Sequence, residues 1–89
     1  MNIENTGNIP SESEIAARVE ALLGKMSLAE KIGQLTQIGG LPFLPGPKPE
    51  EIIRQGGAGS VLWINDTKTF NALQRIAVEE SPSKIPLLF

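Results

Sequence analysis

The sequence contains no cysteine and no histidine. Without cysteine, disulfide bonds and thiolate metal sites are excluded. Histidine is the commonest metal ligand and general base near neutral pH, so any catalysis by this chain has to use carboxylates, lysine or hydroxyl groups. We expect no cofactor and no metal.

Long apolar runs and clusters of basic residues are also missing. No segment approaches the roughly 18 consecutive apolar residues of a membrane-spanning helix. Residues 1–10 have neither a basic nor an apolar segment, so we expect no export signal in this chain and, by default, a cytoplasmic location. The eight Lys and Arg residues are interspersed with ten acidic ones, for a net charge of -2. This balance argues against nucleic acid or an anionic membrane as a partner.

The 89 residues are enough for one small domain. We expect a flexible lead-in over residues 1–10 and a folded part over residues 11–89. Two capping-box patterns, Ser11 with Glu14 and Ser27 with Glu30, predict two helices. The first helix should end at Gly24, and its apolar face comprises Ile15, Val19, Leu22, Leu23 and Met26. The second should end at Gly39 and Gly40, and its apolar face comprises Leu28, Ile32, Leu35 and Ile38.

Glycine and proline shape the middle of the chain. Gly33 lies inside the second predicted helix, where it costs about 1 kcal/mol relative to Ala, so we expect a neighbouring backbone to pack closely against it. Four of the seven prolines lie in Leu41–Pro49, which predicts a loop. Pro49 suits a first helical position and should open a short helix that Gly56 closes.

The remaining sequence predicts a strand, a helix and a second strand. Ser60–Ile64 is a short apolar run typical of a buried parallel strand. Asp66 is a natural N-cap for a helix over residues 67–80, whose core-facing residues are Phe70, Leu73, Ile76 and Ala77. "KIPLLF", residues 84–89, reads as another buried strand, and a buried strand in this position leads us to expect an interrupted chain. Together they form one βαβ unit.

Few residues are candidates for chemistry. Asn65 and Asp66 follow a strand, where α/β folds place functional groups, but we favour a helix cap for Asp66. The acidic pairs Glu50-Glu51 and Glu79-Glu80 are interpreted as solvated helix faces. Trp63 has the side chain to stack on a sugar or a base, but in an apolar strand we favour a core position. The glycines of "GGAGS" precede a strand instead of following one, which disfavours a phosphate-binding loop.

The segment "LLGKMSLAEKIGQLTQI", Leu22–Ile38, is similar to a segment of a known family. This segment resembles the Met-Thr/Ser-x-x-Glu-Lys-Ile-Gly-Gln segment near the start of glycoside hydrolase family 3 enzymes. "GGAGSVLWIN" and "IPLLF" follow in the family's order. The resemblance covers roughly Ala21–Phe89 and is closest to the periplasmic β-glucosidase-like branch, whose members are often periplasmic or secreted.

The resemblance implies an α/β fold, namely the opening portion of an N-terminal (β/α)8 barrel with its first helices and about two parallel strands. Family members hydrolyse β-glucosides with retention, through an Asp nucleophile and an acid/base residue that both lie beyond Phe89. No catalytic, substrate-binding or metal-binding residue is therefore assigned in this chain. The partners implied are a β-glucoside or oligosaccharide, the rest of the barrel and C-terminal domains. The alternative is a non-catalytic helical interaction module derived from the family.

Overall fold

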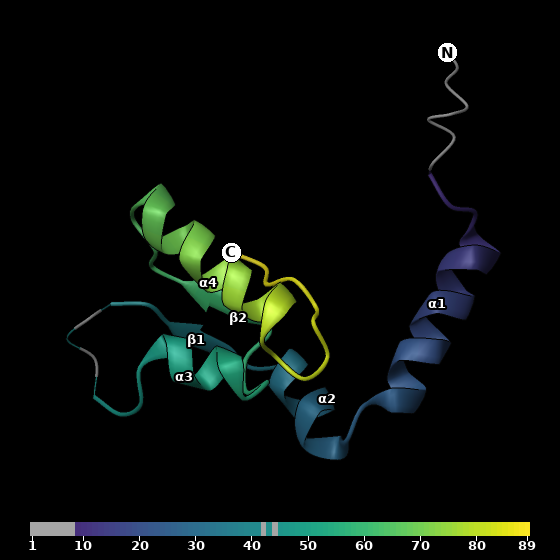
Figure 1. The fold of residues 1–89 in the computed structure, drawn as a ribbon, viewed down its shortest axis with the longest axis horizontal. Helices are drawn as coiled ribbons and strands as arrows, with labels where there is room; N and C mark the ends of the chain where they lie inside the picture. Colours follow the sequence, from purple (N-terminus) through teal and green to yellow (C-terminus); the bar gives the residue numbers. More distant parts are fainter. Residues whose placement is uncertain (1–8, 42, 44) are drawn as a thin grey trace, which may run out of the picture.

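The computed structural model describes residues 9–41, 43 and 45–89. In chain order, the elements of this part are α1 (Glu12–Lys25), α2 (Leu28–Gln34), β1 (Gln37–Gly39), α3 (Pro49–Arg54), β2 (Ser60–Leu62) and α4 (Thr67–Glu79) (Figure 1). Helices and parallel strands confirm the α/β class. The predicted lead-in falls almost entirely outside the described residues.

Local capping signals predicted the helices well. Both capping boxes are present, and in the second the Glu30 N–H donates to Ser27 Oγ at 3.1 Å while the Ser27 N–H donates to Glu30 Oε1 at 3.2 Å. α1 continues to Lys25, one residue beyond the predicted stop at Gly24. α3 begins with Pro49 in its first turn, and Asp66 caps α4.

The second helix is shorter than predicted, and a strand replaces its last turn. α2 ends at Gln34, and β1 pairs in parallel with β2, with Ile38 opposite Val61. The Thr36 carbonyl, between the two elements, accepts the Gly59 N–H at 3.0 Å. Pairing with a segment more than 20 residues away therefore overrides the helical spacing that placed Ile38 on a helix face.

The C-terminal segment forms a single bridge where a strand was predicted. Leu88 lies parallel to Ser60: its N–H donates to the Gly59 carbonyl at 3.0 Å, and its carbonyl accepts the Val61 N–H at 2.9 Å. The Gln74 side chain of α4 also holds this segment, since its Oε1 accepts the Leu87 N–H at 2.7 Å. Leu88 thus occupies a third position in the sheet, beside β2.

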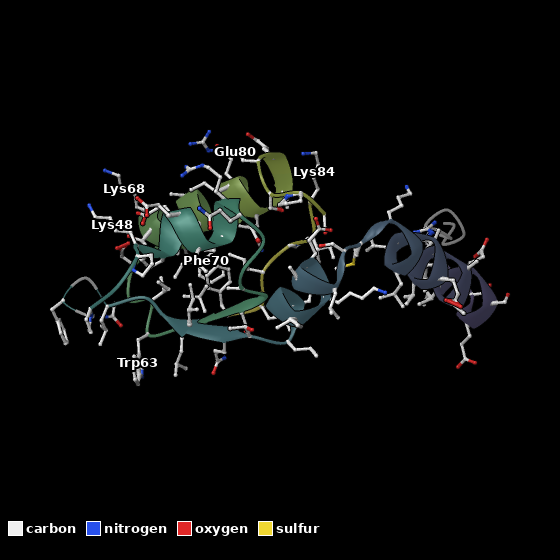
Figure 2. All side chains as sticks on the ribbon, turned by 90° about the horizontal axis from the view of Figure 1, so that it is seen from below. Lys48, Trp63, Lys68, Phe70, Glu80 and Lys84 are labelled. Carbon is white, nitrogen blue, oxygen red and sulfur yellow. The ribbon has the colours of Figure 1, made fainter. Side chains whose placement is uncertain are left out.

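The core lies between the sheet and the helices α3 and α4, which pack against each other. Figure 2 shows both helices on one side of the sheet. The buried apolar residues are Ile53, Ala58, Val61, Leu73, Ile76, Ala77 and Leu87. Phe70 is less buried than predicted and stacks on Phe89, with ring centroids 3.7 Å apart. One compact core therefore unites residues 49–89 with β1.

The opposite face of the sheet has no covering layer among the described residues. Val61 faces the helices and is 2% exposed, whereas the next residue, Leu62, is 43% exposed. α1 lies apart from the sheet and buries no residue (Figure 1). The Cα radius of gyration is 15.2 Å, compared with about 12 Å for a compact domain of this length. Among the described residues, no helix is long and apolar enough to cross a membrane.

Candidate functional site

A cavity of about 740 Å³ opens at the carboxyl ends of β1 and β2. Gly40 follows β1, and residues 63–66 follow β2. The opposite wall comes from the proline-rich segment and from the start of α3, and it includes Lys48 and Glu50. Parallel α/β folds bind ligands at this edge of the sheet, so the cavity is the candidate functional site.

Trp63 lines this cavity, and its predicted core position is wrong. The side chain is 55% exposed, and the backbone has a φ of 68°, in the left-handed region. This turn ends β2 at Leu62, two residues before the predicted end at Ile64, and Figure 2 shows Trp63 projecting away from α3 and α4. The sequence pattern missed this because the apolar run continues unchanged through the backbone turn.

Asp66 is confirmed as a helix cap. Its Oδ1 accepts the Thr69 N–H at 2.8 Å, and its Oδ2 accepts the Thr69 hydroxyl at 2.9 Å. The hydroxyl bond, followed by the backbone bond, lowers the pKa of the Asp66 carboxyl below its ordinary value. Both oxygens are thus engaged by the first turn of α4. Asn65 precedes the cap, is exposed and also lines the cavity.

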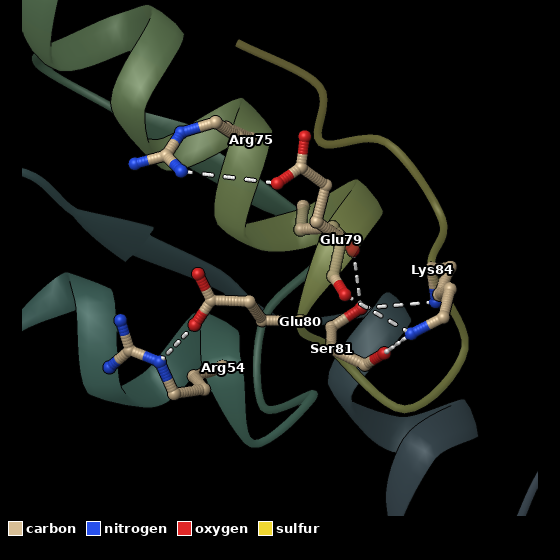
Figure 3. Close-up of polar contacts among 7 residues, drawn as sticks. Arg54, Arg75, Glu79, Glu80, Ser81 and Lys84 are labelled. Atoms are coloured by element: carbon tan, nitrogen blue, oxygen red, sulfur yellow. Dashed lines mark hydrogen bonds and ion pairs between the residues drawn. The ribbon is translucent and has the colours of Figure 1, made fainter.

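The two acidic pairs do not form paired carboxylate sites. Glu80 accepts a hydrogen bond from Arg54 Nε of α3 at 2.7 Å, and Glu79 lies 3.9 Å from Arg75 of its own helix (Figure 3). The hydrogen bond to Arg54 lowers the pKa of Glu80. These exposed ion pairs match the interpretation as solvated helix faces, and the Arg54–Glu80 pair joins α3 to the end of α4.

Glu50 and Glu51 also differ in their surroundings. Glu50 lines the cavity, whereas Glu51 does not. The sequence analysis did not predict that Glu50 and Lys48 line a cavity. The sequence feature that could have indicated this position is the short proline-rich connection, which leads the chain from the end of β1 back to the start of α3. Among the described residues, no group of three or more acidic side chains is arranged to bind a metal ion.

The cavity therefore combines an exposed indole, an amide, an ammonium group and two carboxylates, one of which is occupied by its helix cap. Such a set can bind a polar organic molecule by stacking and hydrogen bonding. Acid–base hydrolysis of a glycoside requires two free carboxyl groups. Among the described residues that line the cavity, only one carboxylate is free.

Comparison with known proteins gives a similarity to a glucosidase. No protein-family model matches the chain. The chain is 30% identical to the lysosomal beta glucosidase of Dictyostelium discoideum over 109 aligned positions, which cover 96% of this chain and 13% of that protein. The alignment is longer than the chain, so it includes positions where the relative has additional residues. The chain thus spans about an eighth of the curated relative that it matches, and the similarity supports a glucosidase-like relationship.

Proposed function

We propose that this chain is the N-terminal portion of a β-glucosidase-like hydrolase of glycoside hydrolase family 3. In this proposal it supplies the first helices and strands of a (β/α)8 barrel and does not hydrolyse glycosides alone. The observation that carries the proposal is a parallel sheet that, in the described part of the chain, has helices on one face only, in a chain similar to a lysosomal beta glucosidase.

The order of the strands supports a barrel over other α/β folds. β1, β2 and the bridge at Leu88 lie side by side in chain order, and the intervening helices α3 and α4 are on the same face. Doubly wound sheets have helices on both faces, whereas a barrel keeps all helices outside and fills its interior with side chains. In the barrel, Leu62 would point into that interior.

The cavity is consistent with a supporting position in such an enzyme. Active sites of these barrels are built at the carboxyl ends of the strands, from loops contributed by several βα units. Retaining hydrolysis needs two carboxyl groups about 5 to 5.5 Å apart. In this proposal, both of them lie beyond Phe89. The substrate, a β-glucoside or related oligosaccharide, would therefore be bound and cleaved only by the larger protein.

Activity measurements on two lengths of the protein test the proposal. The coding sequence is read beyond the codon for Phe89, and the continuous reading frame is expressed beside the 89-residue chain. We expect the longer protein to hydrolyse an aryl β-glucoside and the 89-residue chain to give only the background rate. Turnover by the purified short chain, or a longer protein without glycosidase activity, would count against the proposal.

A second candidate function is a non-catalytic interaction module that retains the family's first helices. The exposed apolar face of α1 favours this alternative, because such a face is suited to a protein partner. A stop codon directly after Phe89, together with a stable folded chain, would support the module over the partial barrel.

A further inference from the structure

A turn in the backbone places Trp63 on the face of the sheet opposite to the helices. Side chains alternate between the two faces of a strand. Val61 is buried under the helices, and Leu62 is exposed on the other face, so a regular strand would return Trp63 to the helix side. Its φ of 68° breaks this alternation, and Figure 2 shows the side chain projecting away from α3 and α4. Ile64 packs against the core instead.

The turn at Trp63 is costly and does not serve packing. A left-handed φ brings the Cβ atom of a residue close to the following carbonyl oxygen. Burial does not offset this strain, because the side chain is 55% exposed. Strained residues cluster at ligand-binding sites, and Trp63 lines the cavity of about 740 Å³ at the carboxyl ends of β1 and β2. Trp63 therefore has the placement of a binding residue.

We propose that Trp63 is the stacking surface for an uncharged sugar ring in this cavity, and that the 89-residue chain has this binding site by itself. The apolar face of a sugar ring packs on an indole, while its hydroxyl groups donate and accept hydrogen bonds. Asn65 supplies an amide that does both, and Glu50 supplies an acceptor. The volume of the cavity lies within the range of about 300 to 1,000 Å³ for small-molecule sites.

The charges around the cavity favour an uncharged ligand over a nucleotide. The charged residues that line it are one cation, Lys48, and two anions, Glu50 and Asp66. A helix N-terminus can bind a phosphate group, but Asp66 already accepts the Thr69 N–H and hydroxyl at the start of α4. A phosphate group would meet the negative charge of this carboxylate. The choice of a β-glucoside among uncharged sugars rests on the proposed function.

Binding of cellobiose, a β-linked disaccharide of glucose, to the 89-residue chain tests the proposal without hydrolysis. Trp63 is the one tryptophan in a chain without tyrosine, so its fluorescence reports this site alone. We expect a saturable change in its emission, with a dissociation constant on the order of 1 mM, and no change with adenosine monophosphate. No saturable change with cellobiose, or tighter binding of adenosine monophosphate, would overturn the proposal.

Substitutions at Trp63 separate binding from folding. Saturation-transfer NMR on the cellobiose protons measures binding in variants without tryptophan. Trp63→Gly should weaken binding by about tenfold or more, yet keep the circular dichroism spectrum, because glycine adopts this φ without strain. Trp63→Phe keeps an aromatic face and should retain part of the binding. Phe43→Gly is the matched control, because Phe43 is 77% exposed and is not among the described residues that line the cavity. It should bind cellobiose like the unsubstituted chain.

Undiminished binding by Trp63→Gly, or an equal loss in Phe43→Gly, would overturn the proposal. If Trp63→Gly does not fold, the fluorescence titration and Trp63→Phe still decide the question. The outcome is also separable from that of the proposed function. A longer protein that hydrolyses a β-glucoside, beside an 89-residue chain that does not bind cellobiose, would contradict this inference alone. Binding of cellobiose through Trp63, beside a longer protein without glycosidase activity, would contradict the proposed function alone.

Discussion

At the scale of single residues, Trp63 has an unusual combination of features. Its φ of 68° is costly for a side chain with a Cβ atom, and its indole is 55% exposed. Glycine adopts this conformation without strain. We therefore expect Trp63→Gly to leave the stability unchanged or to raise it slightly, measured as the thermal midpoint by far-UV circular dichroism.

Two features make this test informative. Replacing a buried tryptophan with a small residue lowers the free energy of unfolding by about 3 to 5 kcal/mol. A large fall in the midpoint would therefore mean that Trp63 is in the core, as predicted from the sequence. Trp63 is also the one tryptophan in a chain without tyrosine, so its fluorescence reports this site alone. Emission typical of a solvent-exposed indole would agree with the exposed position.

Asp66 links the stability of α4 to pH. The hydrogen bonds from Thr69 lower its folded-state pKa below the ordinary value of 3.8. The stabilising effect of this carboxylate is therefore complete above pH 3.8 and is lost as the pH falls through the lower folded-state pKa. We expect helix content to fall over this acidic range and Asp66→Asn, which keeps a capping oxygen without a titratable charge, to show a smaller fall. Identical acid titrations of the two proteins would exclude this role.

At the scale of elements, Gly33 and Gly24 form a matched pair of helical glycines. A Cβ atom on Gly33 would overlap the carbonyl oxygen of Gly56, whereas one on Gly24 would have no neighbour within 4 Å. The sequence prediction that a backbone packs against Gly33 is thus confirmed.

The same pair gives a prediction of opposite signs. Gly24→Ala should stabilise the protein by about 0.5 to 1 kcal/mol, because Ala is the better helix former. Gly33→Ala should destabilise it, because the backbone of α2 must move away from Gly56. Thermal midpoints by circular dichroism measure both changes. A stabilising Gly33→Ala would mean that the close contact between α2 and Gly56 is absent in solution.

The elements also show what sequence reasoning reached and what it missed. Helix starts were predicted because a cap depends on residues only three apart, as with Ser27 and Glu30. β1 was missed because its three residues are defined by pairing with β2, more than 20 positions away. The same difference applies to the candidate site. The role of Asp66 as a cap was predicted from neighbouring residues, whereas Lys48 and Glu50 line the cavity only because of the tertiary fold.

At the scale of the whole molecule, the described part has a covering layer on one face of its sheet. α3 and α4 cover one face of the sheet, while Leu62 and Leu88 remain exposed on the sheet. Parallel sheets are stable when both faces are covered. The edges are also open, because the β1 edge and the Leu88 bridge have no further strand among the described residues. These features agree with a portion of a larger α/β domain.

Urea unfolding of the 89-residue chain tests this central claim most directly. It is followed both by far-UV circular dichroism and by Trp63 fluorescence, at a concentration where light scattering shows monomer. A small complete domain unfolds in one cooperative transition with a slope of about 1 to 3 kcal/mol per molar urea. We predict a shallower, broad transition with different midpoints for the two signals, because helices cover the sheet on one face only among the described residues. One sharp transition, coincident in both signals and within that range of slopes, would contradict the partial-barrel account.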